Sequence, residues 1–446
     1  MNTARQHSAG QMAGPDLAPP VDADILARAM ASVDGERFIA NLQRLASFGG
    51  RDGEQSAERG IGVCRQALGA EELRAKQWLC GLFFGEAYRW TQDAIGNLFL
   101  RRRGLDERLA PLLIGSHIDT QPTGGWLDGA YGVMAGYELC MALDTAGVDT
   151  LRGIEIAAWT NEEGSRFAPG AMGSSAFVRP ELLETYLEAR DAGGCSVRAE
   201  VDALQAALPG AGMVPLGHPV HAYLEAHIEQ GPVMEANGTT LAVVEAIQGV
   251  RWYQVKVRGR SAHAGTTPRD ARQDALLAAA QLITELDRRV HELADARLRW
   301  TVGQITARPG AINTIAQEVE FSIDLRHPEI EVLERIEAAL KQMLETAAGG
   351  GCRTQLGCLM ARSPTLFHSA ALAAVEAGVR AAGEPFCTMT SGAFHDAMYL
   401  ADACPAAMLF VPSIGGISHH PDEHTQHMHL IAGARALTAA ALHLAR

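Results

Sequence analysis

Residues 111–120 read Pro-Leu-Leu-Ile-Gly-Ser-His-Ile-Asp-Thr, an apolar run that ends in a glycine and then in polar side chains. Such a run is typical of a buried strand in a parallel sheet, which is covered on both faces. His117 and Asp119 are two residues apart, so they lie on the same side of an extended chain. Ligands bind beyond the carboxyl ends of the strands in open α/β sheets. The stretch therefore predicts a strand with a binding site at its end.

Three further apolar runs end in polar residues of the same kind. Adjacent carboxylates at a strand end repel each other unless a cation or a proton offsets them, although a Glu-Glu pair is also common on surfaces. Asp128 precedes a predicted helix, where it could be a plain N-cap. Taken together, carboxylates and histidines at strand ends favour zinc, manganese, cobalt or nickel over magnesium or calcium. The runs, each with the polar residues at its end, are 154–159 with Glu162 and Glu163, 222–228 with His227 and Gln230, and 406–411 with His419 and His420.

Helices and strands alternate around these runs. This alternation predicts a mostly parallel sheet with helices on both faces. We expect helical spacing over 24–48, 58–69, 129–146, 370–382 and 429–444, and further strands over 96–101 and 111–115.

The pattern changes near Ala246. Residues 318–326 alternate between apolar and polar side chains, which indicates a sheet with one buried and one exposed face. Elements expected at 250–258, 270–293, 299–308, 318–326, 329–348 and 353–360 follow the β-α-β-β-α-β order of the ferredoxin-like module. We therefore expect a loose N-terminus over 1–21, a discontinuous α/β domain over 22–245 and 361–446, and an inserted domain over 246–360.

Composition excludes several classes of partner. The formal net charge of −14 argues against nucleic acid or an anionic membrane surface, since both require basic patches. No apolar run is long enough to span a membrane, and the N-terminus lacks signal-peptide character. The 8 cysteines are scattered singly, which favours a reduced, cytoplasmic protein.

The chain carries, in order, the motifs GSHIDT, GGWLDGAYGV, NEEGSRFAPGAMGS, HIEQGP, GRSAHAGTTP, INT with DLR, SGAFHDA and GISHHPDE. This ordered set resembles the amidase, hydantoinase/carbamoylase family of the dinuclear M20-type metallopeptidase superfamily. The resemblance implies a zinc-peptidase-like three-layer α/β catalytic domain with an inserted ferredoxin-like α+β domain for dimerisation or as a lid. It also implies a homodimer.

The resemblance further implies a role for individual residues. Glu162 would be the general base acting on a water between two divalent metal ions, and Asp119 would support a ligand. His263 would polarise the substrate carbonyl, often in the partner subunit's site, and His420 fills a variable place in its motif. The implied metal ligands are His117, Asp128 (bridging both ions), Glu163, His227 and His419, and the implied substrate contacts are Gln230, Asn313 and Arg326.

One of these positions can be assessed from the residues themselves, and the resemblance marks another position as a departure from the family. Arg326 lies on the polar phase of its strand, and arginine is the natural bidentate partner of a carboxylate, although a solvated edge charge would look the same. Phe394 stands where many relatives have glycine, which leaves the accepted side chain open. His395 and Asp396, which follow it, match the family motif in a supporting role.

The implied reaction is hydrolysis of the carbamoyl C–N bond of an N-carbamoyl-L-amino acid or β-ureido acid, releasing the amino acid, ammonia and carbon dioxide. The first alternative is an allantoate amidohydrolase, which needs polar contacts for a second ureido arm. A non-catalytic homologue would have lost a ligand or the base, and neither is lost here. An ordinary dipeptidase is disfavoured by the spacing of Asn313 and Arg326.

Overall fold

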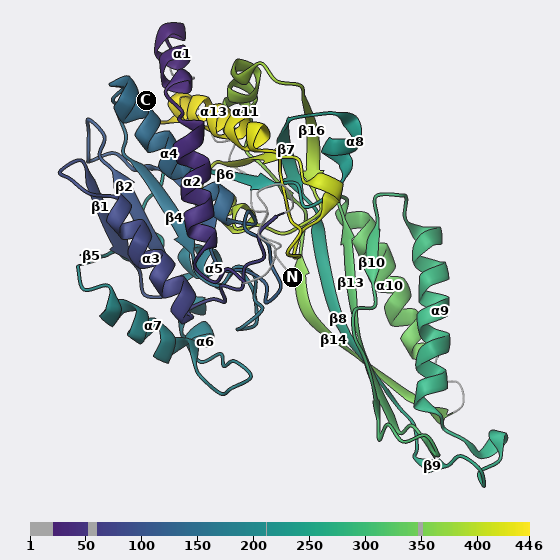
Figure 1. The fold of residues 1–446 in the computed structure, drawn as a ribbon. Helices are drawn as coiled ribbons and strands as arrows, with labels where there is room; N and C mark the ends of the chain where they lie inside the picture. Colours follow the sequence, from purple (N-terminus) through teal and green to yellow (C-terminus); the bar gives the residue numbers. More distant parts are fainter. Residues whose placement is uncertain (1–20, 52–59, 211, 347–350) are drawn as a thin grey trace, which may run out of the picture. The chain divides into compact units, whose positions relative to one another are not determined.

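The computed structural model describes residues 21–51, 60–210, 212–346 and 351–446, which form two compact units (Figure 1). The first unit comprises the chain up to Val243 with His368–Cys387 and Asp402–Arg446. The second comprises Val244–Phe367 with Thr388–Ala401. The loose N-terminus expected over 1–21 lies outside the described residues apart from Val21. The assignment of the units as a catalytic domain and an inserted domain stays a prediction.

A mixed sheet forms the centre of the first unit. Its four central strands are parallel, as expected, whereas β2 runs antiparallel to β4 and β1 antiparallel to β2. The short strand β5 pairs with β1 at the edge. In spatial order the strands are β17 (Ala406–Val411), β6 (Ala222–Ile228), β3 (Leu112–His117), β4 (Ile154–Trp159), β2 (Leu98–Arg102), β1 (Tyr88–Gln92) and β5 (Gly212–Met213).

Helices cover both faces of this sheet because side chains alternate along each strand. On one face, Ile156 of β4 lies against Gly136 of α4 (Ala130–Ala146). On the other face, Trp159 packs edge-on against Phe177 of α5 (Met172–Val178). The remaining helices of this unit are α1 (Ala23–Ala31), α2 (Gly35–Ala46), α3 (Ala70–Leu82), α6 (Leu183–Leu187), α7 (Val197–Ala207), α8 (Val233–Asn237), α11 (Ser369–Ala382) and α13 (His427–Leu444).

Local capping and backbone geometry changed two of the expected helices. The helical stretch expected over 24–48 is two helices, because the side chain of Asp34 accepts a hydrogen bond from the backbone of Arg37 and starts α2. The helix expected over 58–69 is wrong for its described part, 60–69. There the backbone takes left-handed φ values of 96° at Gly60 and 56° at Leu68, and the helix α3 begins only afterwards.

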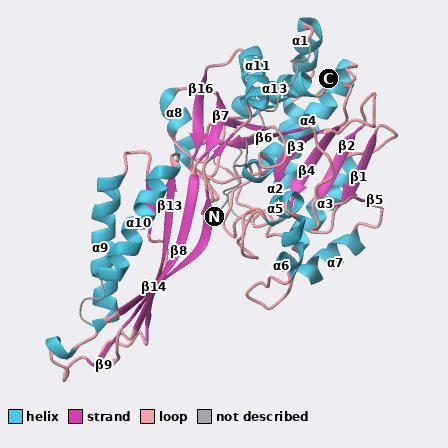
Figure 2. Cartoon of the chain, turned by 180° about the vertical axis from the view of Figure 1, so that it is seen from behind, coloured by secondary structure: helices cyan, strands magenta, loops and turns pink. Residues whose placement is uncertain are grey.

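The second unit contains an antiparallel sheet with two helices on one face (Figure 2). Along β13 the side chains alternate between buried and partly exposed, as the sequence pattern predicts. This arrangement and its strand order match the ferredoxin-like module. In spatial order the strands are β10 (Arg299–Thr301), β13 (Glu318–His327), β8 (Gly249–Arg258) and β14 (Arg353–Arg362), with β11 (Ile305–Arg308) also beside β13; the helices are α9 (Ala275–Leu293) and α10 (Ile330–Thr346).

Shorter elements complete the described chain. β9 (Ala262–His263) and β12 (Thr314–Ile315) pair at the tip of the second unit. The boundary between the units runs through β7 (Leu241–Ile247) and β16 (Phe386–Ser391), which pair with each other. β15 (Thr365–Leu366) and α12 (Ala397–Leu400) belong to the second unit. None of the described helices is long and apolar enough to cross a membrane, and all eight cysteines are free thiols.

Candidate metal centre

Histidine and carboxylate side chains gather at one edge of the first unit's sheet. His117 is the last residue of β3, His227 lies near the end of β6, and Glu163 follows β4. Because these strands are parallel, their carboxyl ends meet at the same edge. Asp128 comes from the loop before α4, and His419 from the loop after β17. The structure therefore brings together all five residues that the resemblance implies as metal ligands.

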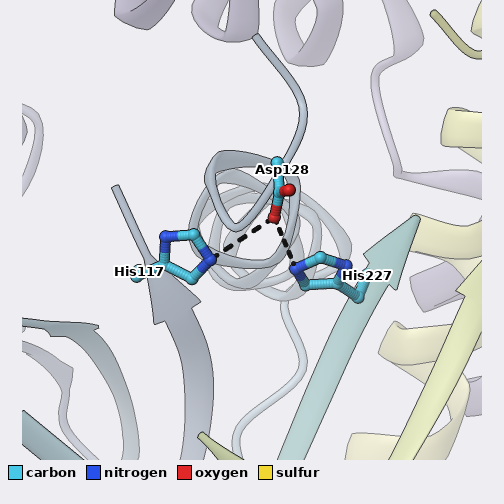
Figure 3. Close-up of side chains that lie close together, drawn as sticks. All are labelled: His117, Asp128 and His227. Atoms are coloured by element: carbon cyan, nitrogen blue, oxygen red, sulfur yellow. Dashed lines mark ion pairs between the residues drawn. The ribbon is translucent and has the colours of Figure 1, made fainter. Parts of the chain in front are cut away.

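These five side chains form two groups that share Asp128. In the first group, Nε2 of His117 is 3.4 Å and Nε2 of His227 is 3.2 Å from Oδ1 of Asp128 (Figure 3). In the second group, Nε2 of His419 is 3.2 Å from Oδ2 of Asp128 and 3.5 Å from Oε2 of Glu163. Each group offers three possible ligand atoms within 4.8 Å of one another. One carboxylate thus presents an oxygen to each group.

The donor set and its spacing suit metal ions. Two atoms that each lie about 2.0–2.1 Å from a tetrahedral zinc ion are roughly 3.3 Å apart. The nitrogen–oxygen separations around Asp128, 3.2–3.4 Å, agree with that spacing. Imidazole nitrogens mixed with carboxylate oxygens suit zinc, manganese, cobalt and nickel. The residues therefore fit a metal-binding role in both groups.

Backbone carbonyls orient the two buried histidines. Nδ1 of His117 lies 2.9 Å from the carbonyl oxygen of Asp119, and Nδ1 of His227 lies 2.9 Å from that of Ile228. A proton on Nδ1 leaves the lone pair on Nε2, facing Asp128, as a metal ligand requires. Burial lowers the pKa of His117, but the charge of Glu162 and the contact with Asp128 raise it further than burial lowers it. The centre is thus rich in negative charge, which a bound cation would balance.

Asp119 contacts both the His117 ring and the loop after β4. Its Oδ1 lies 3.6 Å from Nδ1 of His117, while the backbone carbonyl of Asp119 makes the closer contact, so its supporting role stays a prediction. The carboxylate also accepts hydrogen bonds of 3.2 Å from the backbone N–H groups of Glu162 and Glu163. Burial raises the pKa of Asp119 to about 6. Asp119 therefore fixes the loop that carries both glutamates.

The side chains of the two adjacent glutamates point to different groups. Oε2 of Glu162 lies 3.4 Å from Nε2 of His117, whereas Glu163 faces His419. Glu163 also accepts hydrogen bonds from the backbone N–H of Gln121 at 3.1 Å and from its Nε2 at 2.8 Å. Burial and the charge of Asp128 raise the pKa of Glu163 to about 7. The two adjacent glutamates therefore serve different groups, Glu162 lying beside the first group and Glu163 belonging to the second.

Gln230 contacts the shared carboxylate. Its Nε2 donates a 2.7 Å hydrogen bond to Oδ2 of Asp128, while its Oε1 is buried without a partner among the described residues. Gln230, Asn161 and His419 have left-handed φ values of 58°, 54° and 55°. Each such residue other than glycine costs about 1–3 kcal/mol, and such residues concentrate at functional sites. The loops at this edge are therefore held in strained conformations.

Glu423 is a site residue that our sequence analysis left without a role. It is fully buried, and its Oε1 accepts 3.0 Å hydrogen bonds from the backbone N–H groups of Leu127 and Asp128. Its Oε2 lies 2.9 Å from Oγ of Ser418, which is also 3.1 Å from Oδ2 of Asp128, so the two carboxylates compete for one hydroxyl hydrogen. Burial raises the pKa of Glu423 to about 7. The motif GISHHPDE ends on this residue, so the sequence did contain a signal for it.

We expect Glu423→Gln to weaken metal binding by about 10- to 100-fold, the usual effect of removing a group that orients a ligand. The amide carries no negative charge, and its Nε2 end must donate to Oγ of Ser418 where the carboxylate oxygen accepts, so the hydrogen bonding beside Asp128 changes. Competition with a chromophoric chelator measures the affinity. Glu188→Gln, at an exposed position, is the matched control. An unchanged affinity would show that Glu423 has no part in holding the centre.

Three other predicted residues, His263, Asn313 and Arg326, lie in the second unit, where Arg326 is far from the other two. His263 in β9 pairs with Thr314 in β12, and the backbone N–H of Ala264 donates to the carbonyl oxygen of Asn313, so His263 and Asn313 are neighbours at the tip (Figure 1). Arg326 lies at the other end of β13, eight residues beyond Glu318. At about 3.3 Å per residue, the two ends of that strand are roughly 26 Å apart. Asn313 and Arg326 therefore do not come together within one chain.

Arg326 and the SGAFHDA segment have partners within the second unit. Arg326 donates from Nε and Nη2 to the carboxylate of Asp324 and from Nη1 to the carbonyl oxygen of Gly392. The ring of Phe394 packs edge-on against Trp252 at 6.4 Å. His395 is buried, with its Nε2 3.0 Å from Oγ of Ser391. Asp396 is also buried.

A carboxylate and histidine cluster at the carboxyl ends of parallel strands is an arrangement suited to a metal-dependent α/β hydrolase. The chain belongs to peptidase family M20/M25/M40, whose model matches residues 113–443.

Relatives and solved structures agree with this membership. The chain is 36% identical over 415 residues to an N-carbamoyl-L-amino acid amidohydrolase of Geobacillus stearothermophilus, covering 91% of this chain and 97% of the relative. It is 36% identical to an allantoate amidohydrolase of Bacillus subtilis, over 78% of this chain and 84% of that protein. The structure is similar to that of a hydantoinase/carbamoylase family amidase from Burkholderia vietnamiensis, with a TM-score of 0.83, 37% identity and coverage of 96% and 100%.

Proposed function

We propose that this protein hydrolyses the carbamoyl C–N bond of a small N-carbamoyl-L-amino acid or β-ureido acid. The observation that carries the proposal is the pair of histidine and carboxylate groups that share Asp128. The 36% identity with an N-carbamoyl-L-amino acid amidohydrolase supports the choice of substrate class. We place the enzyme in the cytoplasm, a location consistent with eight free thiols.

We infer that two divalent ions, chosen from zinc, manganese, cobalt and nickel, occupy the two groups. His117 and His227 would hold one ion, Glu163 and His419 the other, and Asp128 both. Such ions polarise a carbonyl and make a water molecule acidic near neutral pH. A urea carbonyl is resonance-stabilised, so its hydrolysis requires that assistance.

The chain's own residues supply the proton transfers. Glu162 takes a proton from the attacking water and delivers it to the leaving nitrogen, as a general base that becomes a general acid. Its position supports this role, because Oε2 lies 3.4 Å from Nε2 of His117 while the side chain is only 6% exposed. Asp119 keeps the carboxylate in place by holding the backbone N–H of Glu162. The products are the amino acid, ammonia and carbon dioxide.

Gln230 is suited to contact the ureido group. Its buried Oε1 lacks a hydrogen-bond partner among the described residues, and such an acceptor is costly unless a donor reaches it. The N–H groups of a ureido substrate are donors of this kind. Gln230 thereby recognises the ureido end of the substrate. We assign Arg326 to the carboxylate of the substrate, so that the guanidinium of Arg326 would bind both this carboxylate and Asp324.

We further infer that the enzyme acts as a homodimer. His263 and Asn313 lie at the tip of the second unit, whereas Arg326 lies near the far end of β13, roughly 26 Å along that strand from Glu318. A small substrate cannot touch both ends of that strand. If all three residues contact one substrate, His263 and Asn313 must reach it from a second copy of the chain.

Mixed dimers test this arrangement. Glu162→Gln and His263→Ala chains are each expected to be nearly inactive, since one lacks the base and the other lacks a group that stabilises the oxyanion. When the two are co-expressed, half of the dimers are mixed, and one site of each mixed dimer is intact. We expect about a quarter of wild-type turnover. No recovery would mean that His263 acts in the site of its own chain.

Ammonia release tests the proposed reaction directly. The purified protein, loaded with manganese, cobalt or zinc, is offered N-carbamoyl-L-amino acids, N-carbamoyl-β-alanine and allantoate. We expect turnover of one of the first two substrate classes. Faster turnover of allantoate would select the alternative that the 36% identity with the Bacillus subtilis enzyme supports. If no substrate releases ammonia, the ureido reaction is wrong.

A further inference from the structure

A hollow of about 420 Å³ lies at the opposite edge of the first unit's sheet from the metal centre. Pro111, which precedes β3, and Glu155, the second residue of β4, both line it. β3 and β4 are parallel, so the hollow is at their amino ends. Six-residue strands separate the two edges by roughly 20 Å. The hollow is therefore distinct from the candidate metal centre.

A row of charged side chains from three neighbouring strands lines this hollow. Arg89 of β1 is directly opposite Arg101 of β2, and Arg101 is directly opposite Glu155 of β4. Like charges directly opposite each other destabilise a sheet. Arg89 and Arg101 share one carboxylate, since Oε2 of Glu107 lies 3.3 Å and 3.6 Å from their Nη2 atoms. Two cations in this row thus have one anion between them.

The guanidinium of Arg101 has unused hydrogen-bonding capacity. Its side chain is 90% buried, with 10% exposed, and neither Nε nor Nη2 has a hydrogen-bond partner among the described residues. Gly153 leaves the space that this group occupies, because an added Cβ there would come within 2.8 Å of Nε. Buried charged donors without partners are costly. The fold therefore accommodates the Arg101 guanidinium without supplying hydrogen-bond acceptors for its Nε and Nη2 atoms.

The other charged groups around the hollow are already paired. Oε2 of Glu155 lies 2.7 Å from Nε2 of His218, whose ring is held edge-on between Phe99 and Phe177. Burial lowers the pKa of His218, but its hydrogen bond with Glu155 raises the pKa further, which favours the charged pair. Arg108 is paired with Asp106. Glu155 is thus occupied by His218, and Arg101 remains the group with free donors.

We propose that this hollow binds a small oxyanion, a carboxylate or a phosphate, through Arg101 and Arg89. The planar fork of a guanidinium matches two oxygens of such a group. A bound oxyanion would supply, beside the guanidinium of Arg101, the second negative charge that the row lacks. The site goes beyond the proposed hydrolysis, since it lies at the other edge of the sheet.

Calorimetric titration of the metal-loaded protein with inorganic phosphate, and separately with acetate, tests this site. The metal centre can also bind oxyanions, so the comparison that matters is between variants. We expect Arg101→Gln to weaken binding at one site about tenfold or more. Arg103→Gln, an exposed arginine two residues along the chain, removes the same charge and should leave the affinity unchanged. Whichever of the two ligands binds more tightly shows whether the site prefers a phosphate or a carboxylate.

Two further variants keep the proposal falsifiable if Arg101→Gln does not fold. Arg89→Gln, whose side chain is 47% exposed, should weaken the same binding event. Glu107→Gln should strengthen it, because the carboxylate that competes for both guanidinia becomes neutral. If the affinity for phosphate and the affinity for acetate are each the same in every variant as in the wild type, the proposal is overturned.

Discussion

Glu162→Gln is expected to lower the turnover of an N-carbamoyl acid by about 10²- to 10⁴-fold while the metal content stays that of the wild type. The amide has nearly the same shape as the carboxylate, and the hydrogen bond from the backbone N–H of Glu162 to Asp119 does not involve the changed group. The loop is therefore retained. What is lost is the only group of this side chain that can take a proton.

Glu163→Gln is the matched comparison, because it makes the same substitution one residue along the loop. Its carboxylate faces His419 and Asp128, so its loss should reduce metal binding as well as turnover. Metal analysis together with steady-state rates of ammonia release separates the two variants. If Glu162→Gln keeps full activity with its metals bound, the general base is another group.

Asp128→Asn should have the largest effect on metal content. Its two oxygens face three histidines, His117 and His227 on one side and His419 on the other. A neutral amide offers one weak oxygen ligand and presents an N–H₂ group to the other side. We expect both ions to be lost on dialysis and turnover to fall below detection.

The stability of this variant gives an independent measure. Metals that bind only the folded state stabilise it by about 2.7 kcal/mol when their concentration is 100 times Kd. Wild-type protein should therefore show a higher melting temperature with metal than after treatment with a chelator, and Asp128→Asn should show no such difference. Ser418→Ala removes one hydrogen bond to Asp128 without touching a histidine, and we expect it to keep the metal response. If Asp128→Asn retains one full equivalent of metal, one of the two groups binds its ion without the Asp128 carboxylate.

The strand-end residues could be predicted from the sequence because parallel strands share one edge. His117, Glu163 and His227 each follow or end an apolar run, and the topology alone brings them together. Asp128 does not follow from this argument. As a residue before a helix it looked like an ordinary cap, and only the resemblance implied its bridging role.

Contacts between loops that lie far apart in the sequence could not be predicted from the spacing of residues. The position of the Asp119 carboxylate depends on the backbone of the loop after β4, and spacing along β3 carries no information on that loop. The motif GISHHPDE contains Glu423, but its contact with the backbone of Asp128, 295 residues away, cannot be predicted from the motif. The expected helix is wrong over its described part, 60–69, where left-handed φ values at Gly60 and Leu68 are incompatible with a continuous helix despite the apolar periodicity. The separation of Asn313 from Arg326 likewise follows from the course of β13, in which Arg326 lies roughly 26 Å from Glu318, and not from their spacing of 13 residues.

The left-handed backbone at Asn161, Gln230 and His419 has a consequence for protein engineering. Glycine would relieve the backbone strain at each position, but at Asn161 it would also remove the side-chain hydrogen bonds to the carbonyl oxygens of Phe167 and Pro169, so a screen for heat-resistant variants should favour it at Gln230 and His419. At Gln230 and His419 the same change removes a side chain that contacts Asp128. Selection for thermostability alone would therefore drift toward robust but inactive enzymes, and a useful screen must select for turnover at the same time.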